Sequence, residues 1–184
     1  MKHPLEEKTI KTEQIFNGKV ISLQVDDVEL PNGKNSKREI VKHPGAVAVI
    51  PLTDDNKIVM VEQFRKPLEK AIVEIPAGKL EKGEDPELCA KRELEEETGY
   101  ICGEIEKLVS FYTSPGFADE ILYIYAARKL RKIENPAIPD EDEFVDVIEL
   151  TLEEAQAYIE EQKIHDAKTV YAVQYLQIEQ LKNR

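Results

Sequence analysis

Four glutamates within five residues form the part of this sequence best suited to do chemistry. Residues 92–99 read RELEEETG, with glutamates at positions 93, 95, 96 and 97. At about 100° of rotation per residue, Glu93, Glu96 and Glu97 share one arc of a helix, whereas Glu95 points elsewhere, toward solvent. Like charges at this spacing repel one another, so a cation should accompany them. Carboxylate oxygens suit a hard divalent cation, and we expect Mg²⁺, with Mn²⁺ as the alternative.

The flanking residues predict a strand, a loop and a helix with defined ends. Residues 71–77 (AIVEIPA) alternate as a strand does, and Pro76 should end it because proline cannot donate to a ladder. Asp85 is a suitable N-cap and Pro86 a suitable first helical residue. Gly99 is the residue expected just past the helix end. The glutamates should therefore lie on a helix that spans residues 85–99.

The spacing resembles the Nudix box, G-x5-E-x7-R-E-U-x-E-E-x-G-U, in which U is a bulky apolar residue. The matching residues are Gly78, Glu84, Arg92, Glu93, Leu94, Glu96, Glu97, Gly99 and Tyr100. Tyr100 alone departs mildly from the pattern, because it is aromatic rather than aliphatic. The alternative is a solvated, charge-rich surface helix. The resemblance implies an α/β fold, the Nudix α/β/α sandwich with a mixed β-sheet. It also implies an enzyme that hydrolyses a nucleoside diphosphate linked to another group.

The resemblance also assigns roles to residues of the box. Glu93 and Glu97 are the implied principal metal ligands and catalytic residues, and Glu96 is an additional ligand or an anchor for water. The carbonyl oxygen of Ala77 is a further implied ligand. Arg92 more plausibly orients these carboxylates through charge-assisted hydrogen bonds than contacts substrate.

A second segment narrows the range of expected substrates. Residues 113–120 read TSPGFADE, and Pro115 lies sixteen residues beyond Gly99, which resembles the ADP-ribose pyrophosphatase branch of the Nudix family. Proline and glycine also predict a tight turn here by their own chemistry. The resemblance implies that Pro115 and Gly116 bind substrate and that Glu120 contacts the terminal ribose or a water on the metal.

A third segment supplies a candidate base. Residues 138–144 (IPDEDEF) form a short acidic loop, and in this branch a glutamate from such a loop acts as base on the attacking water. Glu141 is the positional match and Glu143 the second choice. The alternative is a merely solvated acidic turn.

Two arginines resemble substrate contacts of this branch. Arg65 ends the predicted strand 58–65, and Arg38 precedes the predicted strand 46–52. A planar guanidinium can grip phosphate bidentately or stack on adenine. For Arg38 an exposed strand charge is an equal alternative. The three histidines, one of which is His43, are isolated and are expected at the surface.

Composition excludes several classes of protein. The 184 residues include 37 acidic and 25 basic side chains, a net charge of −12, so a nucleic-acid partner is not expected. The two cysteines form no disulfide framework, which suits a reducing compartment. No apolar run reaches membrane length and no secretory h-region opens the sequence, so we expect a cytoplasmic protein with no membrane partner.

The chain divides into an N-terminal region, residues 1–43, and a main domain, residues 44–184. Two predicted strands near 20–30 and 37–43, joined by the turn residues Pro31 to Gly33, make an antiparallel hairpin. Because an isolated hairpin is marginally stable, it must pack on its own chain or on a partner; the resemblance implies a homodimer. Further strands are predicted at 105–112 and 144–150, and further helices from residue 151 and over 167–182.

The resemblance and the residues leave three interpretations. The favoured one is metal-dependent hydrolysis of ADP-ribose to AMP and ribose 5-phosphate. The enzymatic alternative is a Nudix hydrolase for another nucleotide sugar, a dinucleoside polyphosphate or an oxidised nucleotide. The non-enzymatic alternatives are a nucleotide sensor and a generic divalent-ion binder. A sensor commonly loses glutamates of the box, and all of them are present here, which favours an enzyme.

Overall fold

The computed structural model describes residues 3–134 and 144–182 and divides into two compact units. The first unit comprises Met1–Gly45 and Phe111–Leu122, and the second comprises Ala46–Ser110 and Tyr123–Arg184. Each unit is described by itself. No helix in the described part of the chain is both long enough and apolar enough to cross a membrane.

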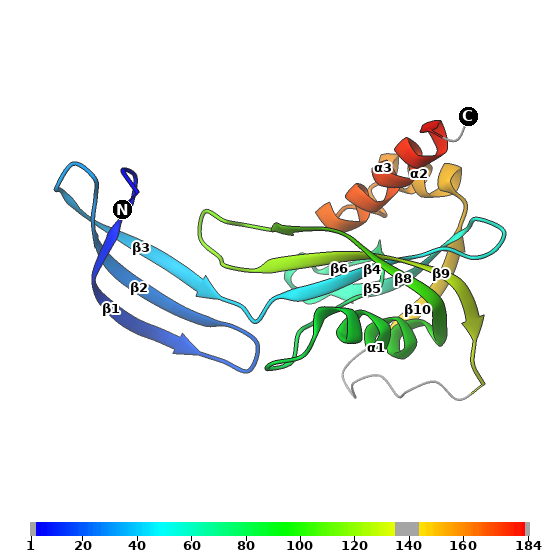
Figure 1. The fold of residues 1–184 in the computed structure, drawn as a ribbon, viewed down its shortest axis with the longest axis horizontal. Coiled ribbons are helices and arrows are strands. Elements are labelled where there is room, and N and C mark those ends of the chain that lie inside the picture. The colour runs from blue at the N-terminus through cyan, green and yellow to red at the C-terminus, as the bar shows by residue number, and fades with distance from the viewer. Residues whose placement is uncertain (1–2, 135–143, 183–184) are drawn as a thin grey trace. The chain divides into compact units, whose positions relative to one another are not determined.

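The N-terminal unit contains a three-stranded antiparallel sheet (Figure 1). Its strands follow the chain in the order β1 (Lys8–Asn17), β2 (Ser22–Glu29) and β3 (Asn35–Lys42). The predicted antiparallel arrangement is confirmed, but the predicted hairpin lacked β1. Every residue of β1 is exposed, so its sequence carries no buried apolar stripe that would identify a strand. The predicted turn is present, with Gly33 at a φ of 79°.

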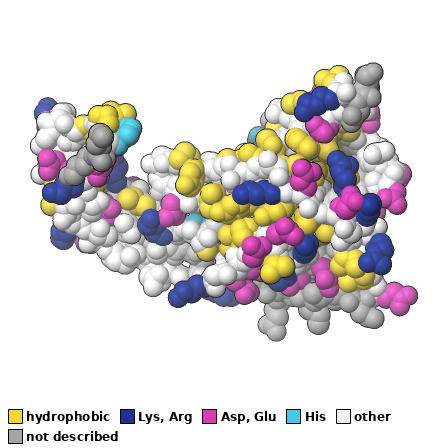
Figure 2. All heavy atoms as spheres, in the orientation of Figure 1, with side chains coloured by type: hydrophobic (Ala, Val, Ile, Leu, Met, Phe, Trp, Pro, Cys, Tyr) yellow, Lys and Arg dark blue, Asp and Glu magenta, His cyan; other side chains and the backbone are white. Residues whose placement is uncertain are grey.

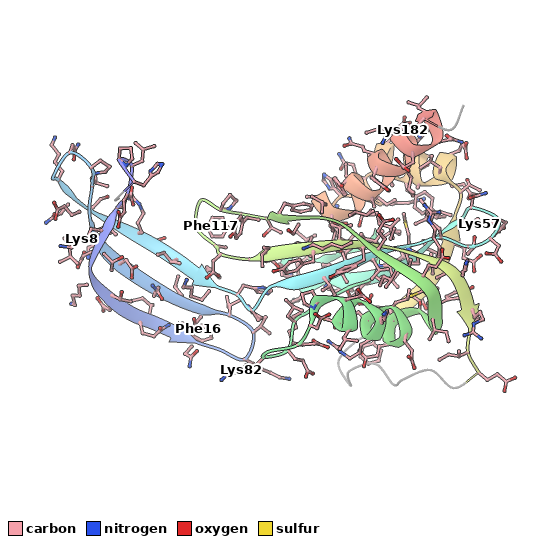
Figure 3. The ribbon with its side chains drawn as sticks, in the orientation of Figure 1. Lys8, Phe16, Lys57, Lys82, Phe117 and Lys182 are labelled. Atoms are coloured by element: carbon pink, nitrogen blue, oxygen red, sulfur yellow. The ribbon has the colours of Figure 1, made fainter. Side chains whose placement is uncertain are left out.

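Residues 111–122 join this unit along the edge of β3. The Val41 N–H donates to the Phe117 carbonyl at 2.8 Å, and the Asp119 N–H donates to the Val41 carbonyl at 3.2 Å. Val41 and Ala118 form a parallel bridge. Phe117 is one of the labelled side chains of this segment (Figure 3). These contacts place the Ser-Pro-Gly segment beside β3.

The second unit is the predicted α/β/α sandwich, which is confirmed (Figure 1). Its strands form two sheets, in the orders β10-β5-β6 and β7-β4-β9-β8. The helix α1 covers one side of these sheets, and α2 and α3 lie on the other. The bounds are β4 (Ala46–Pro51), β5 (Ile58–Arg65), η1 (Lys66–Leu68), β6 (Lys70–Glu74), β7 (Ala77–Lys79), α1 (Pro86–Thr98), β8 (Tyr100–Tyr112), β9 (Ile121–Lys132), β10 (Val145–Leu150), α2 (Leu152–Glu160) and α3 (Ala167–Lys182).

One cluster of buried side chains joins α1 to the sheet beneath it. The cluster combines small and apolar side chains of the helix with those of β4 and β9: Val47, Val49, Cys89, Ala90, Leu94, Tyr125 and Ala127. Burial raises the pKa of the Cys89 thiol to about 12, so this cysteine serves as a small packing residue. The apolar arc of α1 is thereby fixed, and the glutamate arc beside it is oriented.

Local chemistry sets the ends of the helices. The Asp85 side chain accepts hydrogen bonds from the backbone N–H groups of Glu87 and Leu88, and Gly99 takes a left-handed φ of 70° at the other end of α1. At the start of α2, where a helix was predicted from residue 151, Thr151 and Glu154 form a capping box. These features confirm the predicted helix limits.

The predicted strand 71–77 is divided in two. Glu74 ends β6, Pro76 lies in the connection, and Ala77 begins β7, where it pairs with Ala48 of β4. Proline lacks the N–H that a continuous ladder requires. The division moves Ala77 into a different sheet and brings it next to α1.

Candidate active site

The arc of α1 that carries Glu93 and Glu97 faces the interior. The exposed fractions of these two residues are 5% and 4%. Glu95 and Glu96 are partly exposed, so both are more accessible to solvent than the two buried glutamates. Two buried carboxylates one helical turn apart require compensating charge or hydrogen bonds.

Arg92 supplies part of that compensation by bonding three carboxylates of the box. Its Nε and Nη2 donate to the two oxygens of Glu84 at 3.0 and 3.1 Å. Its Nη1 donates to Glu93 Oε1 at 2.8 Å and to Glu96 Oε2 at 2.9 Å. The hydrogen bond from Arg92 holds the pKa of Glu84 well below its ordinary value, at about 2. Arg92 therefore orients the carboxylates, as its position in the box implied.

The connection between β6 and α1 wraps closely around two of these glutamates. The Ala77 N–H donates to Glu97 Oε2 at 3.0 Å. A Cβ atom added to Gly78 would lie 2.0 Å from both Cδ and Oε1 of Glu93, so the Glu93 carboxylate occupies the space that any larger residue would fill. The glycine of the box is thus required by close approach rather than by its φ.

The donors around α1 fit a hard divalent cation. Glu84, Glu93 and Glu96 share one guanidinium, and three carboxylates with one guanidinium have a formal charge of −2. These carboxylates offer oxygen, which Mg²⁺ and Mn²⁺ prefer. Among the described residues no three side chains already converge as a metal cluster. Arg92 engages only one oxygen of Glu93 and one oxygen of Glu96.

Arg65 lies at the end of β5, and one edge of its guanidinium is hydrogen-bonded to Glu74. Its Nε donates to Glu74 Oε2 at 2.5 Å, and Glu74 is 3% exposed. Burial lowers the pKa of Arg65, but the hydrogen bond and charge of Glu74 outweigh burial and the pKa is raised. No hydrogen bond joins Nη1 or Nη2 to another residue that the structure describes. This edge of Arg65 can receive an anion.

In the N-terminal unit, Arg38, Pro115 and Gly116 line one pocket of about 340 Å³. Arg38 Nε and Nη2 donate to the carboxylate of Glu7 at 2.8 and 2.6 Å. Its Nη1 donates to Ser36 Oγ and to the Lys37 carbonyl. Arg38 is therefore a partly exposed strand residue, and the edges of its guanidinium are occupied by Glu7 and by its neighbours.

The Ser-Pro-Gly segment forms the predicted turn. The Ser114 carbonyl accepts hydrogen bonds from the N–H groups of Phe117 and Ala118 at 3.1 and 2.9 Å. Gly116 does not take a positive φ, in contrast to Gly33 and three other glycines. The turn therefore does not depend on the conformational freedom of this glycine.

Glu120 follows the turn and contacts a histidine that the sequence did not single out. The Thr113 hydroxyl donates to Glu120 Oε2, and His43 Nδ1 lies 3.7 Å from Glu120 Oε1. His43 is half-buried and its Nδ1 also accepts the Gly45 N–H. The expectation that His43 is a surface residue was wrong; nothing in its sequence neighbourhood signals this contact.

Glu141 and Glu143, the candidate bases, lie outside the described residues. The described site residues form two groups, one in each unit. Ala77, Glu93, Glu96 and Glu97 come together around α1, and Arg38, Pro115 and Gly116 come together at the pocket beside β3.

Comparison with known proteins decides the family. A family described as the NUDIX domain matches residues 42–173, which include the whole of α1 and its box. The chain belongs to the Nudix family. A second family, the nucleoside diphosphate sugar hydrolase N-terminal domain, matches residues 7–41. The predicted family and the predicted class of enzyme, a Nudix hydrolase, are thereby confirmed.

Relatives of this Nudix protein match it over nearly their whole lengths. A "methanol dehydrogenase activator" of Bacillus methanolicus is 73% identical and covers 95% of both chains. An "ADP-ribose pyrophosphatase" of Bacillus subtilis is 65% identical and covers 96% of this chain and 95% of its own. A crystal structure of an "ADP compounds hydrolase" has the same fold, with a TM-score of 0.84 at 21% identity, over 100% of this chain and 98% of the other.

Proposed function

We propose that this Nudix protein hydrolyses ADP-ribose to AMP and ribose 5-phosphate with Mg²⁺, or with Mn²⁺ in its place. The observation that carries the proposal is the 65% identity, over 96% of the chain, to a protein named ADP-ribose pyrophosphatase. The Ser-Pro-Gly turn and the intact box support it.

The residues around α1 are proposed to hold the metal. Glu93 and Glu97 are the principal ligands, with Glu96 and the carbonyl oxygen of Ala77 completing the set. A divalent cation held by these residues would neutralise phosphate oxygens and would allow water to act as a nucleophile at neutral pH. Arg92 keeps the carboxylates oriented. Glu141, which lies outside the box, accepts the proton of the attacking water.

Each of the two arginines is proposed as a substrate contact. Arg65 has its Nη edge available and its Nε anchored on Glu74, so it suits bidentate contact with the diphosphate. Arg38 has its edges occupied by Glu7 and neighbouring groups, so it suits stacking on adenine. Pro115 and Gly116 line the same pocket as Arg38, and Glu120 is proposed to contact the terminal ribose.

Product analysis tests this function directly. The purified protein should convert ADP-ribose with Mg²⁺ to AMP and ribose 5-phosphate, resolved by chromatography, and a chelator should stop the reaction. A panel of nucleotide sugars, dinucleoside polyphosphates and oxidised nucleotides is the comparison. If ADP-ribose is untouched while another member of the panel is hydrolysed, the substrate is misassigned and the family chemistry stands.

A second candidate function comes from the relative with 73% identity, named a methanol dehydrogenase activator. On this proposal the chain raises the activity of a methanol dehydrogenase. Adding the purified protein to a methanol dehydrogenase assay tests it. A stimulation that disappears in a Glu97→Gln variant would tie the activation to hydrolysis, whereas an unaltered stimulation would separate the two.

A homodimer built through residues 1–43 is also proposed. Strand β1 carries apolar side chains that are each more than half exposed, among them Ile10, Ile15 and Phe16; Phe16 is labelled near the end of β1 in Figure 3. Exposed apolar side chains gathered on one strand favour a surface that a partner covers. Light scattering should give twice the chain mass of 21.0 kDa. An active monomer, or unchanged substrate affinity after deletion of residues 1–43, would refute it.

Cytoplasmic location is proposed because both cysteines are free thiols. Nucleic-acid binding is not proposed, since acidic and basic side chains are interspersed on the face shown in Figure 2 and the net charge is −12. Cell fractionation with an antibody to the protein would test the location.

A further inference from the structure

A row of four alternating charges joins Arg65 to the start of α3. Glu74 contacts two cations: Arg65 Nε donates to Oε2 at 2.5 Å, and Lys168 Nζ donates to Oε1. Lys168 Nζ also donates to Asp166 Oδ1 at 3.0 Å. Two cations and two carboxylates leave the row with no formal charge. Glu74 is 3% exposed, so water cannot replace a missing partner.

The same residues fix the first turn of α3. Asp166 Oδ1 accepts the backbone N–H groups of Lys168 and Thr169 at 3.1 and 3.2 Å. Thr169 is fully buried, and its hydroxyl accepts the Ile75 N–H at 3.0 Å. Among the described residues, Asp166 Oδ2 is buried without a hydrogen-bond partner. Around Asp166, the hydrogen-bond acceptors therefore outnumber the donors. No spare donor there can replace Lys168 as the partner of Glu74.

We propose that Lys168 is a positioning residue for the diphosphate of the substrate, acting through Glu74 on Arg65. The inference rests on the proposed function, in which Arg65 contacts the diphosphate. Lys168 donates a hydrogen bond to one oxygen of the buried Glu74 carboxylate. Arg65 therefore donates to Glu74 through its Nε alone. The Nη edge of Arg65 then remains directed to an anion.

Removal of the Lys168 charge has two physical consequences. Glu74 would keep one cation instead of two and would draw more of the Arg65 guanidinium to itself, because a buried carboxylate needs its partners. The row would also have a formal charge of −1 beside the site of an anionic substrate. Both effects weaken substrate binding more than they change the reacting atoms.

The first test compares Lys168→Met with Lys168→Arg by steady-state kinetics. Lys168→Met should raise KM about tenfold, the size expected when a charge-assisted hydrogen bond to substrate is weakened, and leave kcat within about twofold. Lys168→Arg keeps the charge and should restore KM. Lys182→Met is the matched control, because Lys182 makes an exposed ion pair with Glu179 at the other end of the same helix (Figure 3), and it should change neither constant.

A double variant separates positioning from anchoring of the helix. If Lys168 acts by balancing Glu74, the Lys168→Met/Glu74→Gln protein removes both charges and should recover part of the lost affinity. If Lys168 only anchors α3, the double variant should be at least as impaired as the single one, with a lower melting temperature and a lower kcat. That second pattern would overturn the proposal.

Binding of ADP, measured by calorimetry, keeps this test independent of the proposed reaction. ADP carries the diphosphate and needs no turnover, and Lys168→Met should weaken its binding in parallel with KM. A wild-type protein that binds ADP but leaves ADP-ribose intact would refute the proposed function and leave this comparison valid. Equal ADP affinity in wild type and Lys168→Met would refute the role of Lys168 even if ADP-ribose is hydrolysed.

Discussion

Replacing Gly78 by alanine tests whether the carboxylate of Glu93 must stand where the structure places it. The new methyl group would lie 2.0 Å from Glu93 Cδ and Oε1, whereas real Cβ contacts are not shorter than 3.0 Å. The carboxylate must therefore move by at least about 1 Å. Gly78 has no positive φ, so the substitution strains no backbone torsion and acts through this contact alone.

The size of the effect follows from the displacement. A misplacement of about 1 Å in a catalytic group can cost about 10²-fold in rate, and we expect Gly78→Ala to lower kcat/KM by at least that factor. The Mg²⁺ concentration for half-maximal activity should rise, because Glu93 is a proposed ligand. The free energy of unfolding should fall by about 1–3 kcal/mol, as in other overpacked sites.

The assay is a Mg²⁺ titration of nucleotide hydrolysis by four variants: Gly78→Ala, Gly103→Ala, Glu93→Gln and the double variant Gly78→Ala/Glu93→Gln. Gly103→Ala is the matched control: its methyl group would meet Lys129 Cβ at 3.1 Å, which requires a shift of a few tenths of an ångström and touches no box glutamate. Gly78→Ala/Glu93→Gln should be no worse than Glu93→Gln alone, because both changes act on one carboxylate. Full activity of Gly78→Ala at the wild-type Mg²⁺ requirement, or additive losses in the double variant, would refute the reasoning.

Three further predictions concern the carboxylates of the site. Glu93→Gln and Glu97→Gln should abolish most activity and weaken its Mg²⁺ dependence, whereas Glu95→Gln should retain activity; equal losses in a metal titration of all three would contradict the assigned helix face. Glu141→Gln should lower kcat about 10²-fold or more, the usual contribution of a general base, with substrate affinity nearly intact; a normal kcat would move the base role to another glutamate. Glu84 has a pKa held near 2, below the ordinary 4.5, so its stabilisation is complete above about pH 4.5 and is lost as pH falls toward 2. Glu84→Gln should therefore lower the free energy of unfolding, measured with denaturant, by about 2 kcal/mol at pH 7 and by progressively less in acid. A loss that does not depend on pH would contradict the ion pair between Glu84 and Arg92.

Much of the fold followed from signals that act over a few residues. The two ends of α1 were predicted because Asp85 and Gly99 each form backbone hydrogen bonds within the helix turn next to them. No distant residue is needed for such hydrogen bonds. The limits of α3, and of β5 with its four apolar residues at the start, also agree with the predicted ranges. β1 was missed because all of its side chains are exposed, so the only sign of the strand is its pairing with β2, which lies outside its own residues.

The candidate site likewise has features that follow from the local sequence and features that depend on distant residues. The sequence by itself determined the box, the family and the common face of Glu93, Glu96 and Glu97, because helical geometry and fixed spacing are properties of a single segment. Tertiary structure alone decided how the two arginines differ. Arg38 is held by Glu7, 31 residues away, and the Glu74 that holds Arg65 is itself held by Lys168, 94 residues further along the chain. Such pairs form only when segments far apart in the chain come together in the folded structure. No local pattern of residue types encodes which distant charge will meet which.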